Sequence, residues 1–464
     1  MSEQHTFTSF YFLGIGGIGM SALARYFHAL GRQVAGYDHT QSDLTLALQH
    51  EGMPVDYDDL TDRLPSWVNK DSTLIVWTPA VPRDTVLYRF FLANGFTIAK
   101  RSEVLGHITR RRRALCVAGT HGKTTTSTLI AHILSLTATG TNAFLGGISL
   151  NHHSNLLLAP DSPWVVAEAD EFDRSFLHLT PARTVITAID PDHLDIYGTA
   201  EGYQAGFDAY AALVQDSIVI KKSYHLHAAQ CPVHTYSADE EADYFADHIR
   251  MESGRLFFDF HACATAERPA GVLEDMELGV PARFNVENAV AALALLWEEG
   301  IDEPTMRTGL STYQGVHRRF NLRHNTPQVL YIDDYAHHPT ELATALQAAR
   351  FLAPDRYMIA VFQPHLYSRT RDFMSDFARV LGEADEVIVL PIYPARESPI
   401  EGISSDVLAE RIGDKATVVS KQQLADYILS RLKTLNRPTT VMTLGAGDID
   451  RLVQPLEQTL LSCR

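Results

Sequence analysis

A glycine-rich turn followed by a lysine and threonines is the part of this sequence best suited to hold phosphate groups. The turn reads Gly119-Thr120-His121-Gly122-Lys123-Thr124-Thr125 and lies between an apolar run at 114–118 and a helical pattern that begins near Thr124. Backbone N–H groups and the Lys123 ammonium can surround phosphate oxygens, and the Thr124 hydroxyl can bind magnesium. Val117 replaces the first glycine of the standard motif, but the successive threonines argue against a chance helix start. The turn predicts ATP binding.

Acidic clusters follow the next two expected strands. Glu168-Ala169-Asp170-Glu171 follows the apolar run 164–167, and Asp190-Pro191-Asp192-His193-Leu194-Asp195 follows the run 184–189. Open α/β sheets bind their ligands at the carboxyl ends of strands, where both clusters would lie. Carboxylate oxygens suit Mg²⁺, and a histidine could complete a second magnesium shell or orient a water. A single carboxylate would more often be a solvated charge or a helix cap. Two clusters together favour a functional site.

Three glycines near the N-terminus match the G-x-G-x-x-G pattern of dinucleotide-binding turns. Gly14, Gly16 and Gly19 follow an apolar strand and precede a helical pattern, and Asp38 stands where an acidic ribose partner is expected. Taken alone, this pattern indicates NAD. However, the glycines only allow close backbone approach, and the helix N-terminus attracts any pyrophosphate. A UDP-sugar therefore fits equally well.

Two further polar clusters lie in the C-terminal third of the chain. One reads Asp333-Asp334-Tyr335-Ala336-His337-His338-Pro339-Thr340, and the other joins Gln363-Pro364-His365 to Arg369-Thr370-Arg371. Such groups could close over the phosphates and bind a substrate carboxylate through paired hydrogen bonds. Histidines at strand ends are as often ordinary polar residues, so the residues alone leave both interpretations open.

Alternating strand and helix patterns place these motifs in three α/β units. We expect an α/β protein with a Rossmann-like domain at 1–107, a central phosphate-loop ATPase domain at 108–311 and a second Rossmann-like domain at 312–464. The polar stretch 221–260 gives no clear assignment. The apolar strands behind this expectation lie at 10–15, 33–37, 73–77, 114–118, 164–167, 184–189, 329–332, 358–362, 386–390 and 440–444, with a helix at 286–299.

Composition narrows the class of protein. The 464 residues carry a net charge of −17, which argues against a surface dedicated to nucleic acid or anionic lipid. The four cysteines form no CxxC pair, so neither a disulfide framework nor a zinc cage is indicated. We find no signal-peptide pattern and no apolar stretch of about 18 residues that could span a bilayer. These features indicate small-molecule chemistry in the cytoplasm.

The order of the motifs resembles that of the Mur ligases of peptidoglycan synthesis over nearly the whole chain. The resemblance implies an N-terminal domain that binds a UDP-sugar, a central ATPase domain and a C-terminal domain that binds an amino acid. It also reassigns the first glycine turn from NAD to UDP. Besides the clusters above, it is carried by Gly17, Ile18 and Met20 in the first turn, Thr126, Asn285 with Asn288, Arg318-Arg319-Phe320, and Phe362 before Gln363.

The resemblance implies roles for individual residues. Thr124 and Glu168 would bind one magnesium ion, and Glu168 with His193 a second. His193 as a general base for the amine is the alternative. Asn285 and Asn288 would contact adenosine, Arg319 and Asp334 would reach ATP from across a domain interface, and His337 and Arg369 would lie near the amino acid. The UDP-sugar would contact Gly14, Gly16, Gly17, Ile18, Gly19, Met20 and Asp38, and ATP would contact Gly119, Thr120, His121, Gly122, Lys123, Thr124 and Thr125.

Departures from the family pattern indicate the branch. Members that add the second, third and final peptide units usually carry a lysine that becomes carbamylated, and Phe207 stands at that position. The murein peptide recycling ligase also lacks this lysine, but it typically carries a Lys-Arg-Ser-Lys insert that residues 172–179 do not contain. The alanine-adding branch fits best. Phe284 replaces a frequent histidine, and Leu366 replaces a frequent arginine at the expected anchor of the amino-acid carboxylate.

The resemblance therefore implies an ATP-dependent ligase that joins L-alanine to the lactyl carboxylate of UDP-N-acetylmuramate through an acyl phosphate. Lys123, Glu168, His193, His337 and Arg369 would be its catalytic residues. We expect ATP and two magnesium ions, no nucleic-acid or membrane partner, and a monomer or homodimer. The recycling ligase is the alternative within the family. Outside it, an NAD-dependent oxidoreductase would leave the phosphate turn unused, and a nucleotide-gated regulatory module would hydrolyse ATP without joining anything.

Overall fold

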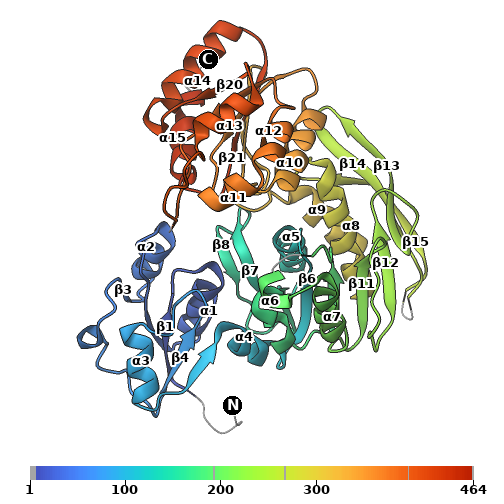
Figure 1. Cartoon of the computed structure of the whole chain (residues 1–464). Coiled ribbons are helices and arrows are strands. Elements are labelled where there is room, and N and C mark those ends of the chain that lie inside the picture. The colour runs from blue at the N-terminus through green and yellow to red at the C-terminus, as the bar shows by residue number, and fades with distance from the viewer. Residues whose placement is uncertain (1–6, 192–193, 266–267, 396, 462–464) are drawn as a thin grey trace. The chain divides into compact units, whose positions relative to one another are not determined.

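A computed structural model describes residues 7–191, 194–265, 268–395 and 397–461 (Figure 1). They form three β-sheets with helices packed against them. By internal contacts, the chain divides into two compact units. The first consists of Met1–His248, Phe258–Glu277 and Glu287–Gln314, and the second of Ile249–Phe257, Leu278–Val286 and Gly315–Arg464. Within the described residues, no helix has the length and apolar character needed to cross a membrane.

The first sheet has five parallel strands in the order β3-β2-β1-β4-β5. Phe10 and Phe12 pack in the cluster that includes α1, whereas Tyr11 and Leu13 pack with α3, so helices cover both faces of the sheet (Figure 1). This explains why its strands read as continuous apolar runs. The elements are β1 (Ser9–Leu13), α1 (Ile18–Ala29), β2 (Gln33–Tyr37), α2 (Asp43–His50), β3 (Val55–Asp56), η1 (Thr61–Arg63), β4 (Thr73–Trp77), α3 (Val86–Ala93) and β5 (Ile98–Lys100).

The second sheet has ten strands in the order β15-β14-β13-β12-β11-β10-β6-β9-β7-β8. Strand β6 lies between β10 and β9, to which it is parallel. The phosphate turn after β6 and the first acidic cluster, at the end of β9, therefore lie at one edge of the sheet. Its strands are β6 (Arg113–Ala118), β7 (Asn142–Ser149), β8 (Ser154–Leu157), β9 (Trp164–Ala169), β10 (Arg183–Ile186), β11 (Ser217–Lys221), β12 (Val233–Ser237), β13 (Tyr244–Glu252), β14 (Arg255–Ala262) and β15 (Gly271–Leu278).

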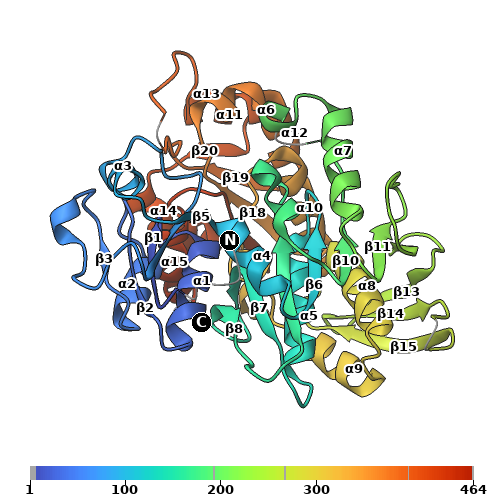
Figure 2. The same ribbon diagram turned by 90° about the horizontal axis from the view of Figure 1, so that it is seen from below.

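The stretch that gave no clear assignment, 221–260, contains β12, β13 and most of β14. Figure 2 shows β13, β14 and β15 side by side at one end of the second sheet. Only one face of β14 is buried, because its buried residues alternate with exposed or partly exposed ones. The helical segments along this part of the chain are α4 (Arg101–Thr109), α5 (Lys123–Ser135), η2 (Phe172–His178), α6 (Leu194–Tyr197), α7 (Ala200–Ala211), α8 (Arg283–Glu298) and α9 (Glu303–Thr312).

The third sheet has six strands in the order β16-β17-β21-β18-β19-β20, and all its pairs are parallel except β16 with β17. The predicted α/β class is confirmed in all three sheets, whereas the boundaries at 107/108 and 311/312 stay predictions. Its elements are β16 (Asn321–Asn325), β17 (Val329–Asp334), α10 (Pro339–Leu352), β18 (Tyr357–Phe362), α11 (Tyr367–Asp372), α12 (Met374–Leu381), β19 (Glu386–Val389), α13 (Ser405–Ile412), β20 (Ala416–Val418), η3 (Lys421–Gln423), α14 (Leu424–Leu435), β21 (Thr439–Leu444) and α15 (Asp450–Leu461).

Candidate active site

The predicted phosphate turn joins β6 to α5 and leaves no room for side chains at its two glycines. Gly119 and Gly122 have φ angles of 127° and 82°, which residues with a Cβ rarely adopt. A Cβ on Gly119 would lie 2.2 Å from Thr187 Oγ1, and one on Gly122 would lie 2.6 Å from Asn288 Oδ1. The glycines thus let the turn pack closely against neighbouring segments at the N-terminus of α5, where backbone N–H groups favour anions.

Lys123 reaches back across this turn. Its Nζ donates hydrogen bonds to the Gly119 carbonyl at 2.6 Å and to the Glu171 carboxylate at 2.9 and 2.7 Å. The side chain of Glu171 is only 2% exposed, so the pair is shielded from water and electrostatically stronger than a surface pair. The structure therefore holds the Lys123 ammonium beside the phosphate turn through a residue of the first acidic cluster.

Thr124 and Glu168 lie together at the start of α5 and near the end of β9. The Thr124 hydroxyl donates a hydrogen bond to Glu168 Oε1 at 2.8 Å. A Cβ on Gly146 would lie 1.7 Å from Glu168 Oε2, so the Glu168 carboxylate occupies space that any side chain at 146 would fill. A hydroxyl and a carboxylate oxygen beside a phosphate turn are hard ligands that suit Mg²⁺. The predicted ligand pair is thus brought together.

The second acidic cluster is only partly described. Asp192 and His193 lie outside the described residues, so the predicted second magnesium site and the role of His193 stay predictions. Asp190 is exposed, and its carboxylate accepts a hydrogen bond from the Tyr224 hydroxyl at 2.7 Å, while its carbonyl accepts one from Thr120 at 2.8 Å. The Thr120 contact ties Asp190 to the phosphate turn.

The predicted adenosine contacts lie near the start of α8. Asn288 Oδ1 accepts a hydrogen bond from Thr126 at 3.3 Å, which places Asn288 beside the first turns of α5. Asn285 is buried, 4% exposed, in the same helix. Phe284, at the position of the expected histidine, packs edge-on against Phe320 with ring centroids 5.7 Å apart.

Phe207, at the position where the family resemblance predicts a modified lysine in other members, lies on α7 and is fully buried. Its ring packs against Phe176 and Tyr203, with centroids 5.3 and 5.2 Å apart. An aromatic core therefore occupies this position, and no amine is present there.

The N-terminal glycine turn is organised by Asp38. Its Oδ2 accepts the Gly16 N–H at 2.8 Å and its Oδ1 accepts the Thr40 N–H at 3.0 Å. Both carboxylate oxygens are thus engaged by backbone groups of the site itself. Gly17 caps the N-terminus of α1, and Ile18, Gly19 and Met20 form its first turn. The turn therefore ends at a helix N-terminus, which favours anions, and its contact with UDP stays a prediction.

Two basic residues that the sequence interpretation missed lie between this turn and the first acidic cluster. A Cβ on Gly19 would lie 2.4 Å from Arg101 Nη1, and Arg101 Nη2 lies 3.2 Å from Asp170 Oδ2. The neighbouring Lys100 pairs with Asp173 at 2.7 Å. Lys100 ends β5 and Arg101 begins α4, and a Lys-Arg pair at such a junction of strand and helix is a signal that could have identified them.

In the C-terminal unit, Asp334 is buried and organises the segment after β17. Its Oδ2 accepts the Phe320 N–H at 2.6 Å and its Oδ1 accepts the Ala336 N–H at 2.7 Å. Burial raises the pKa of Asp334 to about 6, and the charge of Arg319 opposes this shift. The Arg319 guanidinium lies 5.3 Å from the centre of the Tyr335 ring. The predicted pair is therefore assembled around one loop.

The two histidine-containing clusters of this unit meet. The rings of His337 and His365 are 6.2 Å apart, and burial lowers the pKa of both, that of His365 to about 4. The positive charge of Arg369 contributes to both pKa shifts, so this cation lies near both rings. Leu366, with a φ of 68°, precedes α11, on which Arg369 lies. The predicted amino-acid contacts are thus close to one another.

Models of one family match most of the chain. The Mur ligase family, catalytic domain matches residues 9–113, the Mur ligase middle domain 117–296, and the Mur ligase, glutamate ligase domain 318–447. The UDP-N-acetylmuramate–L-alanine ligase of Porphyromonas gingivalis W83 is 50% identical over 458 residues, 97% of this chain and 98% of the relative. The enzyme of the same name from Flavobacterium johnsoniae is 42% identical over 453 residues, 97% of each chain.

Solved structures share the fold. The UDP-N-acetylmuramate-alanine ligase of Thermotoga maritima superposes with a TM-score of 0.82 at 26% identity, over 98% of this chain and all of that one. A murein peptide ligase of Psychrobacter arcticus gives a TM-score of 0.67 at 22% identity, over 98% of both chains. The second likeness concerns the fold alone.

Proposed function

Because this chain belongs to the Mur ligase family, we propose that it is the ATP-dependent ligase that joins L-alanine to the lactyl carboxylate of UDP-N-acetylmuramate. One observation carries the proposal: Lys123, Thr124 and Glu168 meet at the phosphate turn in a chain that aligns over 97% of its length with enzymes of that name. The residues of the site support phosphoryl-transfer chemistry, and the names of the similar enzymes indicate the substrates.

The reaction follows from the chemistry of a carboxylate. Its oxide is too poor a leaving group for direct attack by an amine, so the lactyl carboxylate oxygen first attacks the γ-phosphorus of ATP and ADP leaves. The amine of L-alanine then attacks the acyl carbon, loses a proton, and phosphate leaves as the amide forms. In both steps the enzyme's task is to position reactants and to stabilise negative charge on the phosphoryl group.

The chain's own residues divide this task. Lys123 would move its ammonium from Glu171 to the phosphoryl oxygens as they gain charge. Thr124 and Glu168 would hold magnesium, which neutralises phosphate charge when it is bound. We propose that Arg101 contacts the UDP-sugar, because its guanidinium lies against Gly19 of the first glycine turn. His337 and Arg369 would bind L-alanine.

The alternatives fit less well. In a dinucleotide-binding turn, the acidic residue after the second strand binds the ribose, but here the two oxygens of Asp38 accept the Gly16 and Thr40 N–H groups. A regulatory ATPase would leave the first glycine turn without a role. The recycling ligase shares the fold, and it differs from the proposed enzyme in the amine that it joins to the sugar acid.

A phosphate-release assay tests the proposal. The purified chain should release phosphate from ATP only with both UDP-N-acetylmuramate and L-alanine, and mass spectrometry should find their amide. Release without either substrate would support the regulatory ATPase, and a preference for a tripeptide over L-alanine would support the recycling ligase. We expect the active enzyme to be a monomer or homodimer in the cytoplasm, and light scattering measures its oligomeric state.

A further inference from the structure

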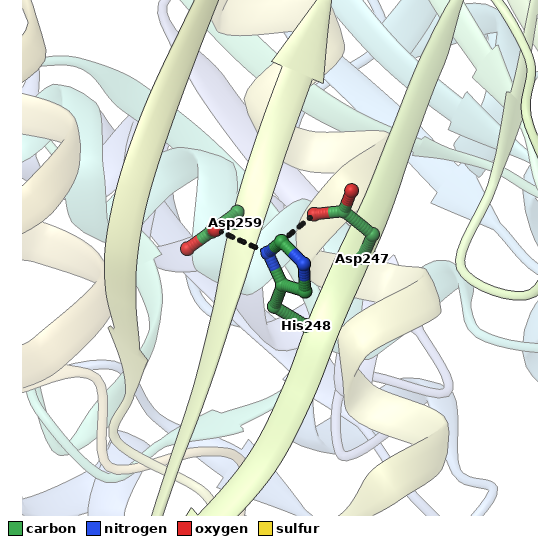
Figure 3. Close-up of side chains that lie close together, drawn as sticks. All are labelled: Asp247, His248 and Asp259. Carbon is green, nitrogen blue, oxygen red and sulfur yellow. Dashed lines mark hydrogen bonds and ion pairs between the residues drawn. The ribbon is translucent and has the colours of Figure 1, made fainter.

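A group of imidazole and carboxylate side chains that the proposed reaction does not use lies on β13 and β14 (Figure 3). On β14, the buried Phe258, Phe260 and Ala262 alternate with Asp259 and His261, which are partly exposed. Residues two apart in a strand share a face, so Asp259 and His261 lie on the outer face of the sheet. Asp247 of β13 lies beside them, with its Oδ1 3.0 Å from His261 Nε2.

His248 joins this group because its backbone departs from the strand conformation. Tyr244 and Ala246 of β13 are buried, so strict alternation would bury His248 as well. Instead, His248 has a φ of 46°, and its side chain is 73% exposed. The left-handed conformation costs a residue with a Cβ about 1–2 kcal/mol. Such local strain persists only where surrounding contacts fix it, and it often marks a functional site.

The distances suit a metal ion. His248 Nδ1 lies 2.8 Å from Asp259 Oδ2 and 3.5 Å from Asp247 Oδ1, and all three atoms lie within 4.8 Å of one another. Bonds of about 2.0–2.2 Å in a tetrahedral shell separate ligand atoms by roughly 3.3 Å. The two distances from His248 Nδ1 lie on either side of this value, so a small cation could replace the contacts of the His248 ring.

Neighbouring groups hold the side chains of Asp259 and Asp247 in place. The Asp275 backbone N–H donates a hydrogen bond to Asp259 Oδ1 at 2.7 Å, while the other oxygen of Asp259 faces His248. The His261 ring stacks on Phe245 at a centroid distance of 4.3 Å and has its Nε2 beside Asp247. Partners of this kind orient metal ligands and raise affinity.

We propose that Asp247, His248 and Asp259 bind a divalent transition-metal ion of the zinc class, with His261 as a positioning residue. An imidazole nitrogen with two carboxylates favours zinc over magnesium and calcium, which prefer oxygen ligands alone. Three protein ligands leave the remaining positions to water. The ion would link β13 to β14, whereas in its absence the His248 Nδ1 contacts both carboxylates.

Zinc titration of the full chain tests this site. Chelator-treated protein would be titrated with ZnCl₂ in excess MgCl₂ against a fluorescent zinc chelator. The wild type should bind one zinc ion that His248→Asn and Asp259→Asn do not bind. Asparagine tolerates positive φ better than most residues and so preserves the backbone at 248, while the amide oxygen introduced by Asp259→Asn can still accept the Asp275 N–H. His261→Asn should bind roughly 10- to 100-fold more weakly.

A matched control and a second measurement keep the result clear. His225 is an exposed histidine elsewhere in the same unit, and His225→Asn should bind zinc like the wild type. Zinc should raise the thermal midpoint of the wild type and of this control but not of His248→Asn, because a ligand stabilises only the state that binds it. Phosphate release should be normal in all these variants. Equal zinc binding by the wild type and His248→Asn would overturn the proposal.

Discussion

The Lys123 ammonium contacts both oxygens of the Glu171 carboxylate, at 2.9 and 2.7 Å, directly beside the phosphate turn. The lysine of the turn therefore has a buried anionic partner. The phosphates of ATP would compete with the Glu171 carboxylate for the Lys123 ammonium. This relationship separates two effects that a lysine variant would otherwise mix. One is the loss of transition-state stabilisation, and the other is the cost of a buried carboxylate without its cation.

Lys123→Ala should reduce ligase turnover by several orders of magnitude and also destabilise the protein by about 3–5 kcal/mol, because it leaves Glu171 buried and unpaired. The double variant Lys123→Met, Glu171→Gln should recover most of the stability but none of the activity. Phosphate release and urea unfolding of the single and double variants measure these effects. Near-normal turnover of either variant would contradict the proposed role of Lys123.

Gly146→Ala should raise the magnesium concentration that the reaction requires, since the added methyl would collide with Glu168 Oε2. Glu168→Gln is the matched variant, because it retains the size of the side chain and removes its charge. Both should lower turnover at limiting magnesium by at least about tenfold, the equivalent of some 1.4 kcal/mol. A magnesium titration of phosphate release is the measurement, and an unchanged titration curve for both would argue against ligation by Glu168.

Arg101→Ala should raise the KM for UDP-N-acetylmuramate by roughly 10- to 100-fold, the loss expected for one charge-assisted contact, with little change in the KM for ATP. Arg110→Ala, at an exposed arginine after the same helix α4, is the control and should leave both constants unchanged. If the KM for ATP rose instead, Arg101 would act through Asp170 and the acidic cluster.

Lowering the pH should reduce the free energy of unfolding, partly through His132. This residue is buried on α5 with its Nε2 3.0 Å from Thr312 Oγ1. Burial and the nearby His152 lower the pKa of His132 to about 4, from 6.5 in the unfolded chain. Above pH 6.5 neither state binds the proton. As the pH falls from 6.5 to 4, the unfolded state binds it first, and stability drops by roughly 2–3 kcal/mol.

His132→Gln should therefore lose less stability between about pH 7 and pH 4 than the wild type does. His225→Gln, at an exposed histidine, should follow the wild-type curve. Urea unfolding across this range makes the comparison, and parallel curves for His132→Gln and the wild type would show that another group dominates.

The features that depend on local sequence patterns, such as buried strands and glycine turns, could be predicted from the sequence. Buried parallel strands such as β6 are continuous apolar runs, and the glycines of the phosphate turn mark its position between strand and helix. The contact between Thr124 and Glu168 could be expected because parallel strands end at a common edge. The carboxylate pairing of Lys123 could not, since nothing in the sequence says which acidic residue of the cluster turns inward.

The remaining features depend on contacts between distant residues. Arg101 became recognisable only when the structure placed it against Gly19 and Asp170. Strands β13 and β14 escaped assignment because one face of each carries polar residues, so neither forms an apolar run. The conformation of His248 follows from pairing across the sheet and has no signature in its own sequence.

Phe207 stands at the position where the family resemblance predicts a carbamylated lysine in other members. Carbamate forms when a neutral amine captures dissolved carbon dioxide, and the phenyl ring at 207 has no nitrogen with which to do so. Its place in a packed aromatic cluster also leaves no polar group at that position. Carbon dioxide and bicarbonate in the cell therefore cannot change the activity of this enzyme by modifying residue 207.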